Sequence, residues 1–153
     1  MKTYKYGYDY PMPSITCDVL VLREKFKTND KGFLETKNEV LLIKRKNEPF
    51  KDCWALPGGF MEIDETLVEC AKRELKEETG IDVNESKLYF KKILDKVDRD
   101  SRGRVVSVVY MTHVSQKTIV NAGDDAKEYA WFEINNLPSN MAFDHKELFN
   151  NVL

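Results

Sequence analysis

The segment of residues 57–81 constrains the fold most, because it joins a turn, an amphipathic helix and a helix stop in one continuous stretch. Asp64 can act as the N-cap, Glu65 suits the positive N-terminal end of a helix, and Gly80 stands where a C′ glycine ends one. We therefore predict a helix over residues 65–79. Its apolar residues fall within an arc of about 100° and form one stripe that must face a core: Leu67, Val68, Ala71 and Leu75.

Strand-like segments surround this helix. Residues 15–22 are apolar and β-branched and predict a largely buried strand, whereas residues 23–38 are polar and predict a long loop, with the question of a hairpin left open. Further strands are expected at residues 39–45, 88–94, 104–114 and 127–134, and a C-terminal helix capped by Asp144 at residues 144–153. The pattern predicts the α/β class, an α+β mixed sheet in a layered α/β/α sandwich, built as a single domain of residues 1–153.

Composition argues against several classes of function. The 153 residues carry a net charge of −2, which gives no global field for nucleic acid or a membrane surface. No apolar run approaches the roughly 18 residues of a membrane span, and the N-terminus lacks the apolar stretch of a signal peptide. Three cysteines are an odd number without framework spacing, which favours a reducing compartment. We therefore predict a cytoplasmic protein with neither nucleic acid nor a membrane as its partner.

Three carboxylates share one side of the predicted helix. Glu74, Glu77 and Glu78 stand at positions i, i+3 and i+4, where like charges destabilise an isolated helix by a few tenths of a kcal/mol per pair. One interpretation is a solvated acidic face that is neutralised by nearby cations: Lys72, Arg73 and Lys76. The other is a site for hard divalent cations, which prefer carboxylate oxygens. Gly58 and Gly59 favour the second, because a glycine turn lets the backbone approach a metal or phosphate closely.

The same segment resembles the Nudix box, G-x5-E-x7-R-E-U-x-E-E-x-G-U, in which U is a bulky aliphatic residue. It matches at every position: Gly59, Glu65, Arg73, Glu74, Leu75, Glu77, Glu78, Gly80 and Ile81. At average residue frequencies such a match recurs by chance on the order of once in 10⁹ starts. The resemblance continues through LLIKR and WALPGGF before the box and AGDDA, WFEI and AFDH after it. It implies the Nudix fold and hydrolysis, with Mg²⁺ or Mn²⁺, of a nucleoside diphosphate linked to another moiety.

The resemblance also implies a set of metal ligands. Glu77 and Glu78 are expected as the principal ligands, assisted by the Gly58 carbonyl. Glu74 is expected to ligate a metal or to accept a proton from the attacking water. Divalent metals suit this reaction because they neutralise phosphate charge and lower the pKa of bound water.

Supporting roles are implied for two further residues of the box. Arg73 is expected to orient the carboxylates through charge-assisted hydrogen bonds, and Glu65 to support the geometry of the loop and helix. In this superfamily the general base can instead come from a loop after the box. Asp124, Asp125 and Glu128 are therefore alternative bases, although a polar turn explains them as well.

The wider pattern is most similar to ADP-ribose pyrophosphatases and to the Nudix domains of bacterial regulators of NAD metabolism. That similarity implies ADP-ribose as the substrate, cleaved to AMP and ribose 5-phosphate. The candidate substrate-binding residues are Arg45, Arg99, Arg102, Arg104 and Phe143, although the last three arginines also fit a salt-bridged surface turn. Tyrosines near the N-terminus fit either adenine stacking or contacts in a homodimer. The alternatives are a pyrophosphohydrolase of nucleoside triphosphates or oxidised nucleotides, and a non-catalytic nucleotide sensor.

Overall fold

The structure, a computed structural model, describes residues 6–123 and 126–150. Its elements in chain order are β1 (Ser14–Thr28), β2 (Leu34–Arg45), β3 (Trp54–Ala55), β4 (Gly58–Phe60), α1 (Leu67–Thr79), η1 (Glu85–Lys87), β5 (Tyr89–Leu94), β6 (Val105–His113), β7 (Ala126–Glu133) and η2 (His145–Phe149), where η marks a 3₁₀ helix. Within the described residues seven strands form one sheet in the order β3-β2-β1-β6-β5, with β4 paired to β1 and β7 to β2. β1 and β6 run parallel and the other pairs antiparallel, so the sheet is mixed.

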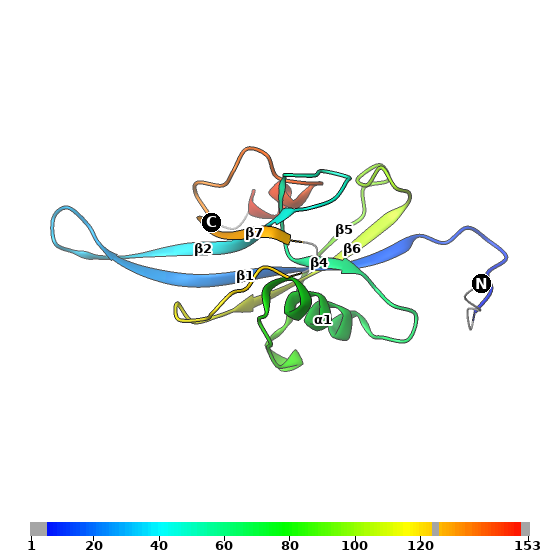
Figure 1. Cartoon of the computed structure of the whole chain (residues 1–153), viewed down its shortest axis with the longest axis horizontal. Helices are drawn as coiled ribbons and strands as arrows, with labels where there is room; N and C mark the ends of the chain where they lie inside the picture. Colours follow the sequence, from blue (N-terminus) through cyan, green and yellow to red (C-terminus); the bar gives the residue numbers. More distant parts are fainter. Residues whose placement is uncertain (1–5, 124–125, 151–153) are drawn as a thin grey trace.

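The central strand β1 serves both layers of the interior, because successive side chains of a strand point to opposite faces. Val19 and Val21 pack on one face with Leu75 from α1. Leu20 packs on the other face with Leu148 from η2. Figure 1 shows α1 on one side of the sheet and η2 on the other. The predicted α/β class with a mixed sheet is confirmed, and the layer opposite α1 contains a short 3₁₀ helix.

Helix α1 starts two residues later than the sequence predicts. Its N-cap is Thr66, whose hydroxyl accepts from the Glu69 N–H at 3.3 Å while the Glu69 carboxylate accepts from the Thr66 N–H at 2.7 Å. In this capping box each residue accepts a hydrogen bond from the backbone N–H of the other. The prediction of Asp64 as the N-cap was therefore wrong. Gly80 is confirmed as the residue that ends the helix, in the left-handed region at φ 71°. Glu65 is thereby left just before the helix.

The predicted loop of residues 23–38 was wrong in its extent. β1 and β2 continue into it and pair as a hairpin, which projects beyond the rest of the sheet (Figure 1). Most of its side chains are exposed on both faces, so the apolar alternation that marks a strand is missing. Cross-strand charges support it instead, including Arg23 with Glu39 at 2.7 Å.

The C-terminal helix predicted over residues 144–153 was also wrong within the described part of the chain. That segment forms only the short 3₁₀ helix η2, and residues 151–153 lie outside the described residues. Asp144 makes no side-chain cap, because its carboxylate binds Arg99 at 2.7 Å. Among the described helices, none combines the length and the apolar character required to span a membrane.

Candidate active site

The glycine turn before α1 is held tightly between a strand and the helix. Gly58 pairs with Asp18 of β1, and a Cβ at Gly58 would lie 2.4 Å from the Asp18 Oδ1. A Cβ at Gly59 would lie 2.6 Å from the carboxylate of Glu74. Both distances are below any normal Cβ contact. The two glycines are therefore required because β4 approaches β1 on one side and a helix carboxylate on the other.

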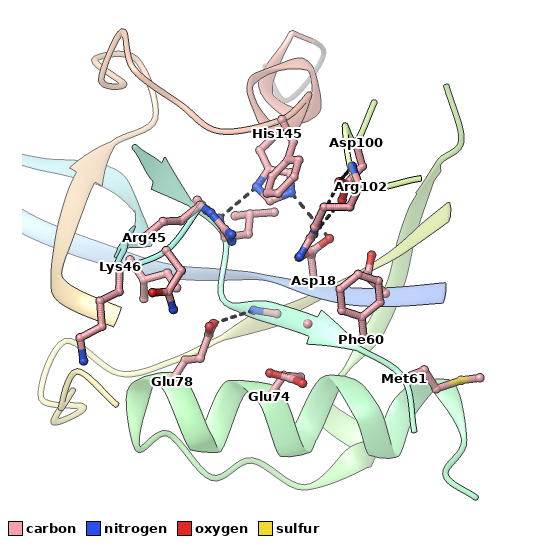
Figure 2. A pocket seen from close by; sticks show the side chains of 18 of the residues that line it. Asp18, Arg45, Lys46, Phe60, Met61, Glu74, Glu78, Asp100, Arg102 and His145 are labelled. Carbon is pink, nitrogen blue, oxygen red and sulfur yellow. Dashed lines mark hydrogen bonds and ion pairs between the residues drawn. The ribbon is translucent and has the colours of Figure 1, made fainter. Parts of the chain in front are cut away.

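A cavity of about 450 Å³ lies where these elements meet. Figure 2 shows Glu74 and Glu78 entering it from α1, with Asp100, Arg102 and His145 on the opposite side. The sequence-predicted residues that line it are Gly58, Arg73, Glu74, Glu78, Arg45, Arg99, Arg102 and Phe143. The cavity thus has an acidic wall on the helix and a wall rich in arginine across from it.

The carboxylates of α1 differ in their environments. Glu78 is only 8% exposed, and its Oε2 accepts from the Gly58 N–H at 2.8 Å. The Glu74 side chain is 14% exposed, and burial raises the pKa of this carboxyl although the Arg73 guanidinium opposes the shift. The Glu77 side chain is 56% exposed and lies outside the cavity lining. Glu74 and Glu78 therefore present buried oxygens to the cavity, whereas Glu77 faces solvent.

Arg73 is the cation that joins the carboxylates of this segment. Its Nη1 donates to Glu74 at 2.6 Å and to Glu77 at 3.3 Å, and its Nε and Nη2 donate to Glu65 at 2.9 and 2.6 Å. Hydrogen bonds from Arg73 hold the pKa of Glu65 at about 2, against its usual 4.5. A fifth contact, at 3.0 Å, reaches the carbonyl of Phe60. Arg73 therefore ties the turn to the helix.

The lysines of the helix do not neutralise the acidic wall. Lys76 binds Asp82 at 2.7 Å, and Lys72 lies 3.8 Å from the same carboxylate. Both contacts are beyond the helix end and outside the cavity lining. A solvated acidic face neutralised by all three neighbouring cations therefore does not describe this helix.

The acidic wall offers donors of the type that hard divalent cations prefer. Glu74 and Glu78 supply carboxylate oxygens to one cavity, and the Gly58 backbone lies beside Glu78. Within residues 6–123 and 126–150, no three acidic, histidine or cysteine side chains converge into a ready-made metal cluster. The donor chemistry fits Mg²⁺ or Mn²⁺, which commonly keep waters and take substrate oxygens as further ligands.

Two of the arginines across the cavity are paired with aspartates. Arg99 binds Asp144 through Nε and Nη2, at 3.1 and 2.7 Å, and this pair is almost fully buried. Arg102 binds Asp100 through Nε and Nη2, at 3.0 and 2.7 Å, while its own side chain is 39% exposed. The salt-bridged turn considered from the sequence is therefore present, and it also forms a cavity wall.

Phe143 lies at the centre of the arginine wall. Its ring centroid is 5.1 Å from the guanidinium carbon of Arg45 and 5.8 Å from those of Arg99 and Arg102. Arg45 also donates from Nε to the carbonyl of Pro49 at 2.8 Å. Burial, and the nearby charge of Arg102, lower the pKa of Arg45. Asp144 and Asp100 already compensate Arg99 and Arg102, so Arg45 and the exposed part of Arg102 are the cationic groups of this wall that suit a phosphate.

Besides Glu65 and Glu77, two more sequence-predicted residues, Arg104 and Glu128, lie outside the cavity lining. Arg104 donates from Nη1 to the backbone carbonyl of Lys96 at 3.3 Å. Glu128 binds Lys44 at 2.9 Å on the exposed surface of the sheet. The structure therefore does not bring either residue to the cavity.

The other two alternative bases, Asp124 and Asp125, lie outside the described residues. The loop just before them is placed on the end of α1, because the Gly123 N–H donates to the Glu78 carbonyl at 2.9 Å. A Cβ at Gly123 would lie 1.7 Å from the Glu77 carbonyl oxygen.

Two further residues of the cavity, Asp18 and His145, were not predicted from the sequence. Asp18 was read only as part of a buried strand, yet it is a buried acid that accepts a hydrogen bond from Ser107. His145 also lines the cavity. The available signal was an Asp within an otherwise apolar strand, because a buried charge needs nearby partners.

Residues 29–152 match the NUDIX domain. ADP-ribose pyrophosphatase from Methanocaldococcus jannaschii is 47% identical over 122 residues, which cover 80% of this chain and 70% of that protein. The ADPR responsive transcriptional repressor NtrR from Acinetobacter baylyi is 34% identical over 145 residues, and the chain spans about half (53%) of its length.

Solved structures agree with these matches. The NUDIX domain of Shewanella oneidensis NrtR complexed with ADP ribose has a TM-score of 0.75 at 26% identity, over 95% of this chain and 90% of that one. A bifunctional NMN adenylyltransferase/ADP ribose pyrophosphatase from Francisella tularensis, complexed with AMP and a Mn ion, has a TM-score of 0.67 at 35% identity, over 90% of this chain and 40% of that one. The chain belongs to the Nudix family of hydrolases.

Proposed function

We propose that this protein hydrolyses ADP-ribose to AMP and ribose 5-phosphate and that Mg²⁺ or Mn²⁺ is required. The observation that carries the proposal is the cavity with two opposed walls, one with Glu74 and Glu78 and the other with Arg45, Arg99 and Arg102. A diphosphate that lies between a metal and guanidinium groups would have its charge neutralised from both sides.

The similar proteins support ADP-ribose as the substrate. The Methanocaldococcus jannaschii relative is an ADP-ribose pyrophosphatase, and the Shewanella oneidensis NUDIX domain was solved with ADP ribose. The Francisella tularensis structure, which contains AMP and a Mn ion, supports both a divalent metal and an adenosine product. Phe60 and Phe143 line the cavity and offer aromatic rings on which an adenine could stack.

Glu78 would hold the metal in this proposal, with the Gly58 carbonyl and Glu77 as further ligands, Glu77 by turning its exposed side chain toward the cavity. The bound metal supplies charge neutralisation of the diphosphate and a water of lowered pKa. Glu74 accepts the proton of the attacking water, and its burial makes the carboxylate a stronger base than an exposed glutamate. The added water oxygen forms a new bond to one phosphorus, and the bond from that phosphorus to the bridging oxygen breaks.

The chain's other residues orient the substrate and the carboxylates. Arg73 holds Glu74 through its 2.6 Å contact. Of the two arginines that are paired with aspartates, Arg102 has the more exposed side chain. It is therefore placed to donate to a phosphate or ribose as well as to Asp100. The buried Arg99 supports that wall through Asp144.

A non-catalytic nucleotide sensor is the second candidate, because the Acinetobacter baylyi relative is a transcriptional repressor that responds to ADPR. The complete set of box residues in this chain favours catalysis. A sensor would bind ADP-ribose in the same cavity without releasing products. The single-domain organisation, a homodimer and a cytoplasmic location stay predictions.

Product analysis on a small substrate panel tests the proposed function. ADP-ribose, NADH, a diadenosine polyphosphate and a set of dNTPs would each be incubated with Mg²⁺, and the products separated by anion exchange. We expect AMP and ribose 5-phosphate from ADP-ribose, with the highest kcat/KM of the panel. A dNTP that outpaces ADP-ribose about tenfold in kcat/KM, a discrimination of about 1.4 kcal/mol, would contradict the assignment. Binding of ADP-ribose without turnover would instead establish the sensor.

A further inference from the structure

His145 is a buried residue whose two ring nitrogens both face polar groups. It is only 2% exposed and comes from η2, far in sequence from the Nudix box. Its Nδ1 lies 3.2 Å from the backbone nitrogen of Leu56, and its Nε2 lies 3.6 Å from Asp18 Oδ2. Figure 2 shows His145 facing Asp18, across the cavity from Glu78.

The partners determine the tautomer of His145. A backbone N–H can only donate, so Nδ1 must be the unprotonated nitrogen that accepts from Leu56. The proton of the neutral ring is then on Nε2, which faces the Asp18 carboxylate. Because Nδ1 uses its lone pair and Nε2 carries the proton, neither nitrogen has a lone pair for a metal or an attacking water. His145 therefore acts on the site through its two partners, of which Leu56 leads directly into the glycine turn.

Leu56 is connected to the acidic wall by a short stretch of backbone. The carbonyl of Pro57 accepts from the Val19 N–H at 2.8 Å, which fixes the turn against β1. The Gly58 N–H donates to Glu78 Oε2 at 2.8 Å. A shift at Leu56 would therefore move the N–H that holds the carboxylate of Glu78. The crowded space around Gly58 leaves little room for such a shift to be absorbed.

The segment that carries His145 is itself firmly anchored. The neighbouring Asp144 forms its double hydrogen bond with Arg99, and both side chains are almost fully buried. The Ala142 N–H donates to the carbonyl of Trp54 at 2.7 Å, which ties the segment to β3, directly before Leu56. A residue held in this way can transmit a fixed position to the turn.

We infer that His145 is a positioning residue for the metal site: by accepting the Leu56 N–H, it fixes the Leu56-Pro57-Gly58 turn and thereby the carboxylate of Glu78. This inference rests on the proposed function, in which Glu78 is a metal ligand. It assigns to η2 a part in metal binding although the proposed ligands come from β4 and α1.

Two substitutions separate the two nitrogens of His145. His145→Asn keeps an acceptor oxygen at the position of Nδ1, whereas His145→Gln places its amide at the position of Nε2 and removes the acceptor. We expect His145→Gln to weaken Mn²⁺ binding by about tenfold to a hundredfold, the usual effect of losing a partner that orients a ligand. His145→Asn should keep Mn²⁺ binding close to that of the wild type. Mn²⁺ affinity would be measured without substrate, by the EPR signal of the free ion.

Hydrogen exchange of the Leu56 amide gives a second measurement that does not depend on metal. We expect slow exchange in the wild type and in His145→Asn, and fast exchange in His145→Gln. For ADP-ribose, His145→Gln should lower kcat more than it changes KM. Should His145→Gln fail to fold, His145→Asn decides: a protected Leu56 amide with wild-type Mn²⁺ affinity supports the inference, as does loss of both together. A change in only one of the two overturns it.

Two controls complete the experiment. His113→Asn replaces the other histidine of the chain, which is exposed at the end of β6, and should leave Mn²⁺ affinity unchanged. Glu78→Gln should weaken Mn²⁺ binding directly. If Glu78→Gln leaves the affinity unchanged, the proposed metal site is wrong. If Glu78→Gln weakens binding while His145→Gln and His145→Asn both match the wild type, the metal site stands and the positioning role of His145 is wrong.

Discussion

Replacing Glu65 by Gln tests how the Nudix segment stabilises its own charges. Both carboxylate oxygens of Glu65 accept from Arg73, at 2.9 and 2.6 Å, and one of them also accepts from the Glu62 N–H at 2.8 Å. The Glu65 side chain is only 13% exposed. Gln has the same size, but it has no charge and its NH₂ group would face the guanidinium donors. The substitution therefore removes the ion pair with little change in packing.

The pKa of Glu65 sets the size of the expected effect. It falls from 4.5 to about 2, mainly through the hydrogen bonds from Arg73, and each pKa unit corresponds to about 1.4 kcal/mol. The full shift is therefore worth about 3 kcal/mol, and residual contacts of Gln reduce the expected loss to about 2 kcal/mol at pH 7. Because the folded-state pKa lies below the unfolded one, this stabilisation is present above pH 4.5 and is lost as the pH falls towards 2.

Urea unfolding of the wild type and Glu65→Gln, at pH 7 and at about pH 3, measures this effect. We expect the difference in unfolding free energy to shrink by more than half at the lower pH, since the wild-type carboxylate then takes up a proton more readily in the unfolded state. Glu24→Gln removes an exposed carboxylate of the hairpin and serves as the control. A difference that stays the same at both pH values would refute the reasoning.

Two further predictions concern the cavity. Gly59→Ala should lower kcat at least tenfold, because its Cβ would displace the Glu74 carboxylate, which lies 2.6 Å from that position. A displacement of about 1 Å can lower a rate about a hundredfold. Steady-state kinetics with ADP-ribose measures the effect, and a wild-type kcat would contradict it. Arg102→Ala should lower kcat/KM for ADP-ribose by about tenfold to a hundredfold, the loss of one charge-assisted contact. Arg104→Ala should leave kcat/KM unchanged, because Arg104 lies away from the cavity lining; equal effects of the two substitutions would contradict the assignment.

Elements with a buried face were predicted well from the sequence. β6 and the inner half of β1 have apolar side chains on buried surfaces, so their residues carry the pattern that burial imposes. The outer hairpin was left open because both of its faces meet solvent. The C-terminal helix was predicted wrongly because Asp144 binds Arg99 and does not cap a helix. Local sequence does not contain such long-range partners.

The candidate site shows the same division. The box residues could be found because a helix fixes the spacing of Glu74 and Glu78, and both line the cavity. Asp18 reaches the cavity from β1 and His145 from η2. Only the packing of η2 on the sheet brings these two residues together. Arg102 and Arg104 look equivalent in the sequence, yet only Arg102 lines the cavity, because the chain turns at Gly103 between them.

The most direct test of the central claim is the turnover of ADP-ribose by metal-stripped protein during a titration with Mg²⁺, for the wild type and Glu78→Gln. The account predicts no turnover in EDTA and recovery of AMP and ribose 5-phosphate formation in the wild type as Mg²⁺ is added. Glu78→Gln should require far more Mg²⁺ and should stay several orders of magnitude slower in kcat, because a buried ligand of the metal is lost. Turnover of the wild type in EDTA at a comparable rate, or near wild-type kcat of Glu78→Gln at saturating Mg²⁺, would contradict it.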